Sequence, residues 1–274
     1  MSHKCLIFFF HGFHIVSNSI YPFSAAIISL ALTSSRVVFF KFGRFLPLFI
    51  SLMSFLFLMF IWFKDVVAEA QRGYHNFYVI DGLKFGIALF IFREVMFFFG
   101  FFWSFFDSSL VPNHELGMQW GPVGVNAINP FDVPLLNTAI LLRSGVTATW
   151  AHHSLLNNKD ALIPMLFTIA LGAYFTFLQW FEYSVASFTV SDRVFGTTFF
   201  VATGFHGLHV LIGTIFLIVT TIRLVKYHFN FLHHVGFEMC LWYWHFVDVV
   251  WLFLYVFIYW WAFYRFSKRK LRLI

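Results

Sequence analysis

The class of fold is decided by the stretch Phe45-Leu-Pro-Leu-Phe-Ile-Ser-Leu-Met-Ser-Phe-Leu-Phe-Leu-Met-Phe-Ile-Trp-Phe63, in which nearly every position is apolar. A helix needs about 20 apolar residues to cross the ~30 Å hydrocarbon core of a membrane. The strand of a membrane barrel instead alternates between polar and apolar residues over about ten positions. The unbroken apolar run therefore predicts a transmembrane helix.

The whole chain has the composition of a membrane protein. Of its 274 residues, 60% are hydrophobic and 11% are charged, and the mean hydropathy is +0.79. A soluble globular domain normally carries about 25% charged residues, so this composition argues against a soluble enzyme. The 44 Phe residues are typical of an A- and T-rich coding sequence such as an organelle genome.

Seven apolar windows predict an all-α, polytopic membrane protein with seven transmembrane helices. Because no soluble domain fits between the windows, residues 1–274 are expected to form a single transmembrane domain, with a basic C-terminal tail over 264–274. The windows cover approximately 20–39, 45–63, 83–106, 134–152, 162–184, 195–222 and 237–263.

Three charged residues lie where charge is costly. Glu94 stands in the third window beside Arg93, and Arg143 stands in the fourth. A charge at the centre of a spanning helix costs on the order of 3 kcal/mol, so Glu94 is either a functional group or a carboxylate neutralised by Arg93. Glu94 or Glu182 is the expected partner of Arg143.

Histidines inside the last two windows leave two interpretations open. His206 and His209 lie three residues apart, hence on one helix face, and Gly204, Gly207 and Gly213 would let another helix approach. Haem ligation that recruits His245 is one interpretation, and hydrogen bonds between helices are the other. The same spacing puts His245 beside Asp248 on one helix face. This pair could relay protons, or it could hold two helices together.

The paired histidines at the end of the fourth window do not predict a metal site. His152 and His153 are adjacent, but metal binding needs at least a third ligand, and none lies nearby in the sequence. Capping or packing is the expected role of this pair. Cys5 and Cys240 form neither a disulfide framework nor a metal motif.

Polar, mainly basic residues that follow two of the windows suggest a site for phospholipid headgroups. Seven spans, oriented by Lys and Arg, bring the two sets to the same side of the membrane. The ordinary excess of positive charge inside the membrane is the alternative explanation, and nothing supports nucleic-acid binding. The predicted lipid-binding residues are Trp62, Glu69, His75, Arg223, Lys226, His228 and His233.

Five segments carry a resemblance to a known family. The chain resembles subunit 3 of cytochrome c oxidase, in its mitochondrial rather than its bacterial or quinol-oxidase form, from about Trp62 to Trp261. The segments are Glu94-Val-Met-Phe-Phe-Phe-Gly-Phe-Phe-Trp103, Ser108-Ser-Leu-Val-Pro-Asn-His-Glu-Leu-Gly117, Trp150-Ala-His-His-Ser154, Thr198-Phe-Phe-Val-Ala-Thr-Gly-Phe-His-Gly-Leu-His209 and Trp242-Tyr-Trp-His-Phe-Val-Asp-Val-Val-Trp251.

The resemblance implies a two-helix and a five-helix bundle, separated by a cleft that holds phospholipids. It also implies an inner mitochondrial membrane subunit beside catalytic subunit 1, with haem and copper in partner subunits. Glu94 matches the family's carbodiimide-reactive carboxylate, and all the predicted lipid-binding residues except His233 match positions around lipid headgroups. Arg93, Arg143 and the basic tail depart from the family pattern.

The expected function is that of a non-catalytic core subunit of the proton-pumping oxidase. Such a subunit would stabilise the catalytic subunit and hold phospholipids near the proton-uptake side. The alternatives are a secondary transporter that uses Glu94 and Arg143, subunit 3 of a quinol oxidase, and a membrane cytochrome that binds haem through His206, His209 and His245.

Overall fold

The computed structural model describes His14, Val16, residues 18–112, His114, Trp120 and residues 125–265. Their regular structure is entirely helical, which confirms the all-α class. Residues 266–274 of the basic tail and Cys5 lie outside the described residues. The helices are α2 Tyr21–Phe42, α3 Leu46–Gln71, α4 Phe77–Leu110, α5 Val133–Leu156, α6 Leu162–Val185, α7 Arg193–Val225, α8 Val235–Leu254 and the π-helix η2 Tyr255–Trp261.

Six spans in the described residues are long and apolar enough to cross a membrane, α8 and η2 counting as one. The remaining helix, α5, contains fewer apolar residues, although its length of 24 residues is enough to span a membrane. With 34 and 33 residues, α4 and α7 exceed the length that hydrocarbon requires, so they tilt or extend beyond it. The polytopic membrane fold is thus confirmed.

The polar residues of α5 point inward. Asn137 and Ser144 are fully buried, and Thr138 is also buried. The indole nitrogen of Trp244 on α8 donates to Oγ of Ser144 at 2.9 Å, and that of Trp251 donates to Oγ1 of Thr138 at 2.9 Å. Polar groups that bond across helices are a common means of joining membrane helices. The composition of α5 therefore reflects its packing against α8.

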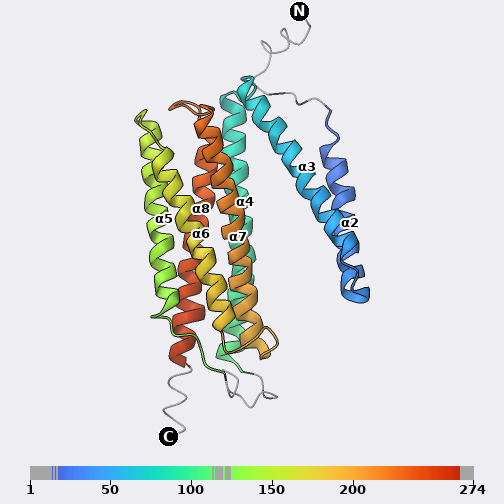
Figure 1. Ribbon diagram of the computed structural model, residues 1–274, viewed down its shortest axis with the longest axis vertical. Helices are drawn as coiled ribbons and strands as arrows, with labels where there is room; N and C mark the ends of the chain where they lie inside the picture. The colour runs from blue at the N-terminus through green and yellow to red at the C-terminus, as the bar shows by residue number, and fades with distance from the viewer. Residues whose placement is uncertain are drawn as a thin grey trace, which may run out of the picture. The chain divides into compact units, whose positions relative to one another are not determined.

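The first compact unit, Met1–Leu83, contains the hairpin of α2 and α3 (Figure 1). Gly43 ends α2 with φ of 68°, and its N–H donates to the carbonyl oxygen of Phe39 at 2.8 Å. This left-handed conformation is strained for residues with a Cβ, which explains the glycine at the turn. Ser35 and Ser51 share a buried hydrogen bond of 2.8 Å between the two helices.

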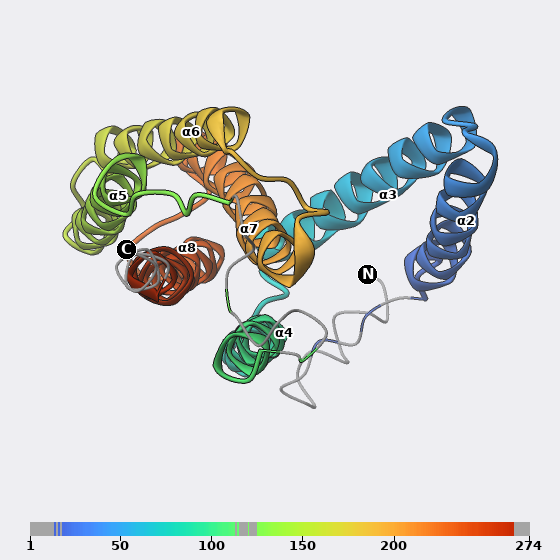
Figure 2. The same ribbon diagram turned by 90° about the horizontal axis from the view of Figure 1, so that it is seen from below.

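The second compact unit, Lys84–Ile274, contains most of α4 and all later helices. Within it, α6 packs against α5 and α7, and α8 packs against the same two helices from another side (Figure 2). The ring of Phe98 joins α4 to this group, since it lies 5.1 Å from His209 of α7 and 6.3 Å from Phe246 of α8.

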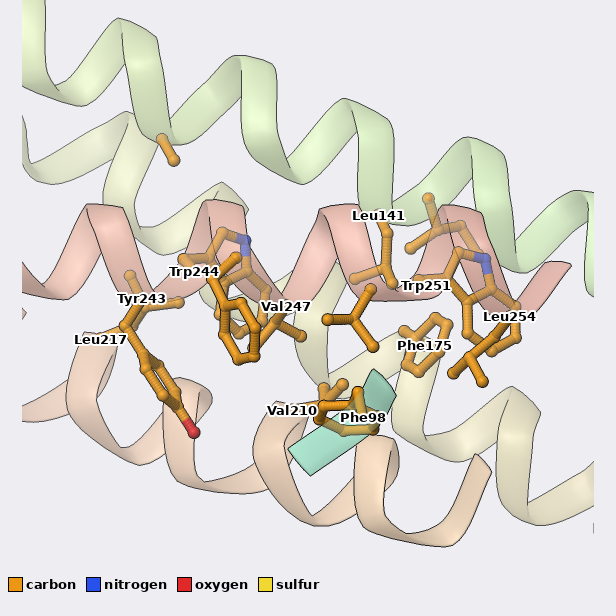
Figure 3. Packing of buried hydrophobic residues seen from close by; sticks show 14 of the residues in the cluster. Phe98, Leu141, Phe175, Val210, Leu217, Tyr243, Trp244, Val247, Trp251 and Leu254 are labelled. Atoms are coloured by element: carbon orange, nitrogen blue, oxygen red, sulfur yellow. The ribbon is translucent and has the colours of Figure 1, made fainter. Parts of the chain in front are cut away.

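The core of this unit is built around two tryptophans of α8. Figure 3 shows Trp244 and Trp251 among side chains from the neighbouring helices. An added Cβ would lie 2.7 Å from the Trp244 ring at Gly172 of α6, and 2.9 Å from it at Gly213 of α7. The indole thus fills a space that exists because both positions are glycine.

The predicted close approach at the glycines of α7 is right at one position and wrong at two. Gly213 meets Trp244, as described above. A Cβ added at Gly207 would have no heavy atom of the described residues within 4 Å, and at Gly204 it would meet the Tyr183 hydroxyl at 4.0 Å. The reason is helical rotation, because α7 turns Gly207 away from α8 while it turns Gly213 toward it.

Candidate functional site

Glu94 lies near the middle of α4, and both oxygens of its carboxylate contact basic groups. Oε1 accepts hydrogen bonds from Nε and Nη2 of Arg93 at 3.1 and 2.6 Å, and Oε2 lies 3.1 Å from Nε2 of His209 on α7. The side chain of Glu94 is 12% exposed, and that of Arg93 is 70% exposed. The carboxylate is therefore held between α4 and α7, with Arg93 on its outer side.

The hydrogen bonds of His209 place a proton beside Glu94. Nδ1 of His209 lies 2.7 Å from the carbonyl oxygen of Phe205, and because a carbonyl only accepts, Nδ1 is the donor. Nε2 faces Oε2 of Glu94, where two lone pairs would repel each other, so a proton must lie between them. The pair is then either imidazolium with carboxylate, or neutral imidazole with carboxylic acid.

The other polar residues predicted inside spans lie at contacts between helices. His206 is 1% exposed, and its Nε2 donates to the carbonyl oxygen of Val247 on α8 at 3.2 Å. Oδ2 of Asp248 lies 4.0 Å from Nδ1 of His245 and faces Gly145 of α5, where an added Cβ would be 2.6 Å away. These residues connect α7 to α8, and α8 to α5.

The predicted lipid-binding residues of the second unit cluster at the carboxyl end of α7. The Arg223 guanidinium stacks on Phe229 at 4.4 Å, and its buried Nε has no hydrogen-bond partner among the described residues. Lys226 is the C-cap residue of α7, His228 follows it, and His233 lies exposed in the same loop.

The surroundings of His228 are electropositive. Burial lowers the pKa of the His228 imidazole, and the neighbouring charges of Arg223 and Lys226 lower it further. Because a second cation is disfavoured there, an anion is favoured. This cluster of Arg223, Lys226 and His228 is called the basic cluster below.

The lipid-binding residues predicted in the first unit lie on α3 and just after it. The ring of Trp62 stacks on Tyr21 with centroids 5.7 Å apart, and Oε2 of Glu69 lies 3.8 Å from Nε2 of His14. His75 is half-buried between α3 and α4. Because α3 continues to Gln71, Glu69 lies on the helix and not after it, contrary to the expected end of the second window.

The hypothesis that Arg143 pairs with Glu94 or Glu182 is wrong. Glu94 contacts Arg93 and His209, and within the described ranges Arg143 has no hydrogen bond or ion pair. Arg143 is exposed on α5, whereas the next residue, Ser144, is buried. Successive helical residues point about 100° apart, so the burial of Ser144 turns Arg143 outward.

A buried carboxylate at Glu182 was missed as a site in its own right. Glu182 is 5% exposed, and its Oε1 accepts hydrogen bonds from the Tyr259 hydroxyl at 2.6 Å and from Nε2 of Gln179 at 3.3 Å. Tyr259 lies in η2, and π-helical turns occur often at functional sites. The signal in the sequence was the lone acidic residue inside the fifth window.

A second group was missed because its members come from distant parts of the chain. His152 on α5 lies with His234 and Glu238 at the start of α8, and a ligand atom of each lies within 4.8 Å of those of the other two. The sequence showed no third ligand close to His152 and His153, and packing of α8 against α5 supplies two further ones for His152. His153 is exposed and not part of the group.

Comparison with known proteins agrees with this architecture. The family model for cytochrome c oxidase subunit III matches residues 11–263. The cytochrome c oxidase subunit 3 of Mammuthus primigenius is 55% identical over 255 residues, which cover 92% of this chain and 98% of that protein. Those of Osphranter robustus and Xenopus laevis are 54% and 53% identical with the same coverage. The chain therefore belongs to the cytochrome c oxidase subunit III family.

Proposed function

We propose that this chain serves cytochrome c oxidase, the oxidoreductase complex of which it is a subunit, by binding phospholipid and by supporting the catalytic subunit. Membership of the family carries the assignment to the complex. The haem and copper of the reaction belong, in this proposal, to partner subunits. The inner mitochondrial membrane is the proposed location, and subunit 1 is the proposed neighbour.

The observation that carries the lipid proposal is the basic cluster. Arg223 presents a guanidinium whose Nε has no partner in the described chain, and it lies beside Lys226 and His228. Guanidinium groups bind phosphate through directed hydrogen bonds, and basic residues just outside a span attract anionic headgroups. The acyl chains of such a lipid would lie along apolar outward residues of α7 such as Ile222 and Val219.

The lipid proposal is tested with the intact complex carrying Arg223→Gln. We expect loss of about one tightly held phospholipid per complex, because the phosphate loses a charge-assisted contact. Phospholipid that remains after detergent washing is counted by mass spectrometry. Arg193→Gln is the matched control, since Arg193 is at the opposite end of the same helix. Full retention of lipid in Arg223→Gln, or equal loss in the control, would contradict the proposal.

Glu94 is proposed to assist proton handling by the complex. The support is the contact with His209, which requires a proton that both groups share. A carboxylate and an imidazole in contact can exchange such a proton with little change in geometry. Packing of α4 against α7 is the competing role for the same contact.

Glu94→Gln separates these two roles. The amide keeps the size and hydrogen bonding of the side chain but cannot titrate. We expect proton uptake to slow and inactivation during turnover to accelerate, each several-fold, in the purified complex. Arg93→Gln is the control, because it leaves the Glu94–His209 contact in place. Unchanged proton uptake in Glu94→Gln would remove the proton role and leave the packing role.

The alternative functions receive less support. A transporter that pairs Glu94 with Arg143 lacks that pair, because Arg143 faces outward on α5. Haem ligation would compete with the hydrogen bonds that His206 and His209 make inside the bundle. A quinol-oxidase subunit is not favoured, since the relatives named above are cytochrome c oxidase subunits.

A further inference from the structure

Three side chains at one end of the second compact unit point ligand atoms toward one another. His152 lies near the carboxyl end of α5, His234 is the N-cap residue of α8, and Glu238 lies in the first turn of α8. One ligand atom of each lies within 4.8 Å of the other two. These helix ends meet at the same end of the unit (Figure 1), the end where α7 also finishes.

The hydrogen bonding of His234 prepares it as a ligand. Its Nδ1 lies 3.1 Å from the carbonyl oxygen of Asn230, which can only accept, so Nδ1 is the donor. Metal-binding histidines are commonly held in this way, with one ring nitrogen bonded to a carbonyl and the other free to coordinate. Nε2 of His234 is accordingly the nitrogen that faces the group, and the side chain is 8% exposed.

Nε2 of His234 lies 3.2 Å from Oε1 of Glu238. A nitrogen lone pair and a carboxylate oxygen repel each other at this distance unless a cation lies between them. Nε2 of His152 is also buried, and it has no hydrogen-bond partner in the part of the chain that the structure describes. One bound cation would satisfy all three atoms, whereas a proton on His234 would leave Nε2 of His152 unsatisfied.

Lys84 on α4 orients the carboxylate. Its Nζ lies 2.7 Å from Oε2 of Glu238, so this oxygen is engaged and Oε1 is turned toward His234. Carboxylate ligands of metals are usually fixed by such outer contacts. The positive charge of Lys84 also opposes a second cation nearby, which limits the affinity expected of the site.

The ligand set suits zinc. Two imidazole nitrogens and one carboxylate oxygen are the donors of many Zn²⁺ sites, with bonds of about 2.0–2.2 Å and a tetrahedral arrangement whose fourth position holds water. Ligand atoms in such a site lie roughly 3.4 Å apart. The three ligand atoms now lie within 4.8 Å of one another, and small side-chain rotations would bring them to that separation.

We propose that His152, His234 and Glu238 form a binding site for a divalent cation of the zinc type, which links α5 to α8 at the membrane boundary. The site is distinct from the basic cluster, for which an anionic headgroup is proposed, and from the Glu94–His209 contact. It does not depend on the proposed lipid or proton roles.

The site is tested in the intact complex with Zn²⁺ as the probe. At micromolar free zinc, we expect the wild-type complex to bind one more zinc ion than complexes with His152→Gln, His234→Gln or Glu238→Gln, as counted by mass spectrometry of the metal. Each ligand change should weaken binding at least tenfold. His153→Gln and His233→Gln are matched controls, because each replaces an exposed neighbour of a proposed ligand.

Crystals of the wild-type complex soaked in zinc provide a test that needs no variant. We expect an anomalous-scattering peak between the three ligand atoms at the zinc edge. Lys84→Gln should tighten binding several-fold by removing the competing charge. No peak at saturating zinc, or equal zinc in wild type and all ligand variants, would overturn the proposal and leave these residues as a hydrogen-bonded lock.

Discussion

At the scale of single residues, polar groups in this chain are kept in an apolar environment by specific partners. Ser144 accepts from the Trp244 indole, His206 donates to Val247, and Glu94 contacts two basic groups. An unpaired polar group in hydrocarbon costs several kcal/mol, so each of these positions depends on its neighbour. The residues after the carboxyl end of α7 differ, because there burial and the neighbouring charges of Arg223 and Lys226 lower the pKa of His228.

The pKa of His228 predicts how the basic cluster responds to pH and to lipid. Because the pKa in the folded chain is below the ordinary value of 6.5, the unfolded chain binds more protons as pH falls below 6.5. Lowering the pH through this window therefore destabilises the folded state. A phosphate bound at the cluster would oppose this effect by raising the pKa.

Histidine C2-hydrogen exchange followed by mass spectrometry measures this pKa in the complex. We expect the pKa of His228 to rise toward its ordinary value in Arg223→Gln, because one of the repelling cations is gone. Phospholipid added back to delipidated wild-type complex should also raise it. A pKa that changes in neither experiment would show that Arg223 and lipid do not act on this imidazole.

At the scale of helices, the closeness of α6, α7 and α8 depends on two glycines. Gly172 and Gly213 leave room for the ring of Trp244, which is fully buried. Membrane helices gain stability from such close packing, since no hydrophobic effect drives them together within lipid. Gly207, on the same helix as Gly213, contributes no such space.

A pair of alanine substitutions tests this packing. We expect Gly172→Ala to destabilise the complex by about 1–3 kcal/mol, because its Cβ would lie 2.7 Å from a rigid indole. Gly207→Ala should be neutral or stabilise by up to about 1 kcal/mol, because alanine favours helix and its Cβ meets no neighbour among the described residues. Thermal denaturation of both complexes gives the comparison. Equal melting temperatures would contradict the role given to Gly172.

At the scale of the whole molecule, the chain presents an apolar exterior and a partly polar interior. Large hydrophobic side chains such as Phe181, Ile215 and Val249 are exposed on outward faces, where lipid or other subunits would cover them. The buried histidines of α7, His206 and His209, contact groups on α8 and α4. The proposal that partner subunits hold the haem rests on these contacts, which haem ligation would have to replace.

The haem content of the complex tests that assignment. We expect His206→Gln, His209→Gln and His245→Gln to leave the visible haem absorbance per assembled complex unchanged, because these imidazoles bond to protein groups. Spectra of reduced and oxidised complexes, normalised to subunit content, provide the measurement. Loss of a haem band in an assembled variant would support ligation instead.

The sequence by itself determined the membrane class, the all-helical fold and the family, because apolar windows and long motifs are local properties of the chain. Phe45–Phe63 and the segment from Thr198 to His209 show this directly. Tertiary structure alone decided that Glu94 meets His209, that Arg143 faces outward and that His152 lies beside His234 and Glu238. The physical reason is helix rotation and packing, which bring residues distant in sequence together and leave no trace in local periodicity.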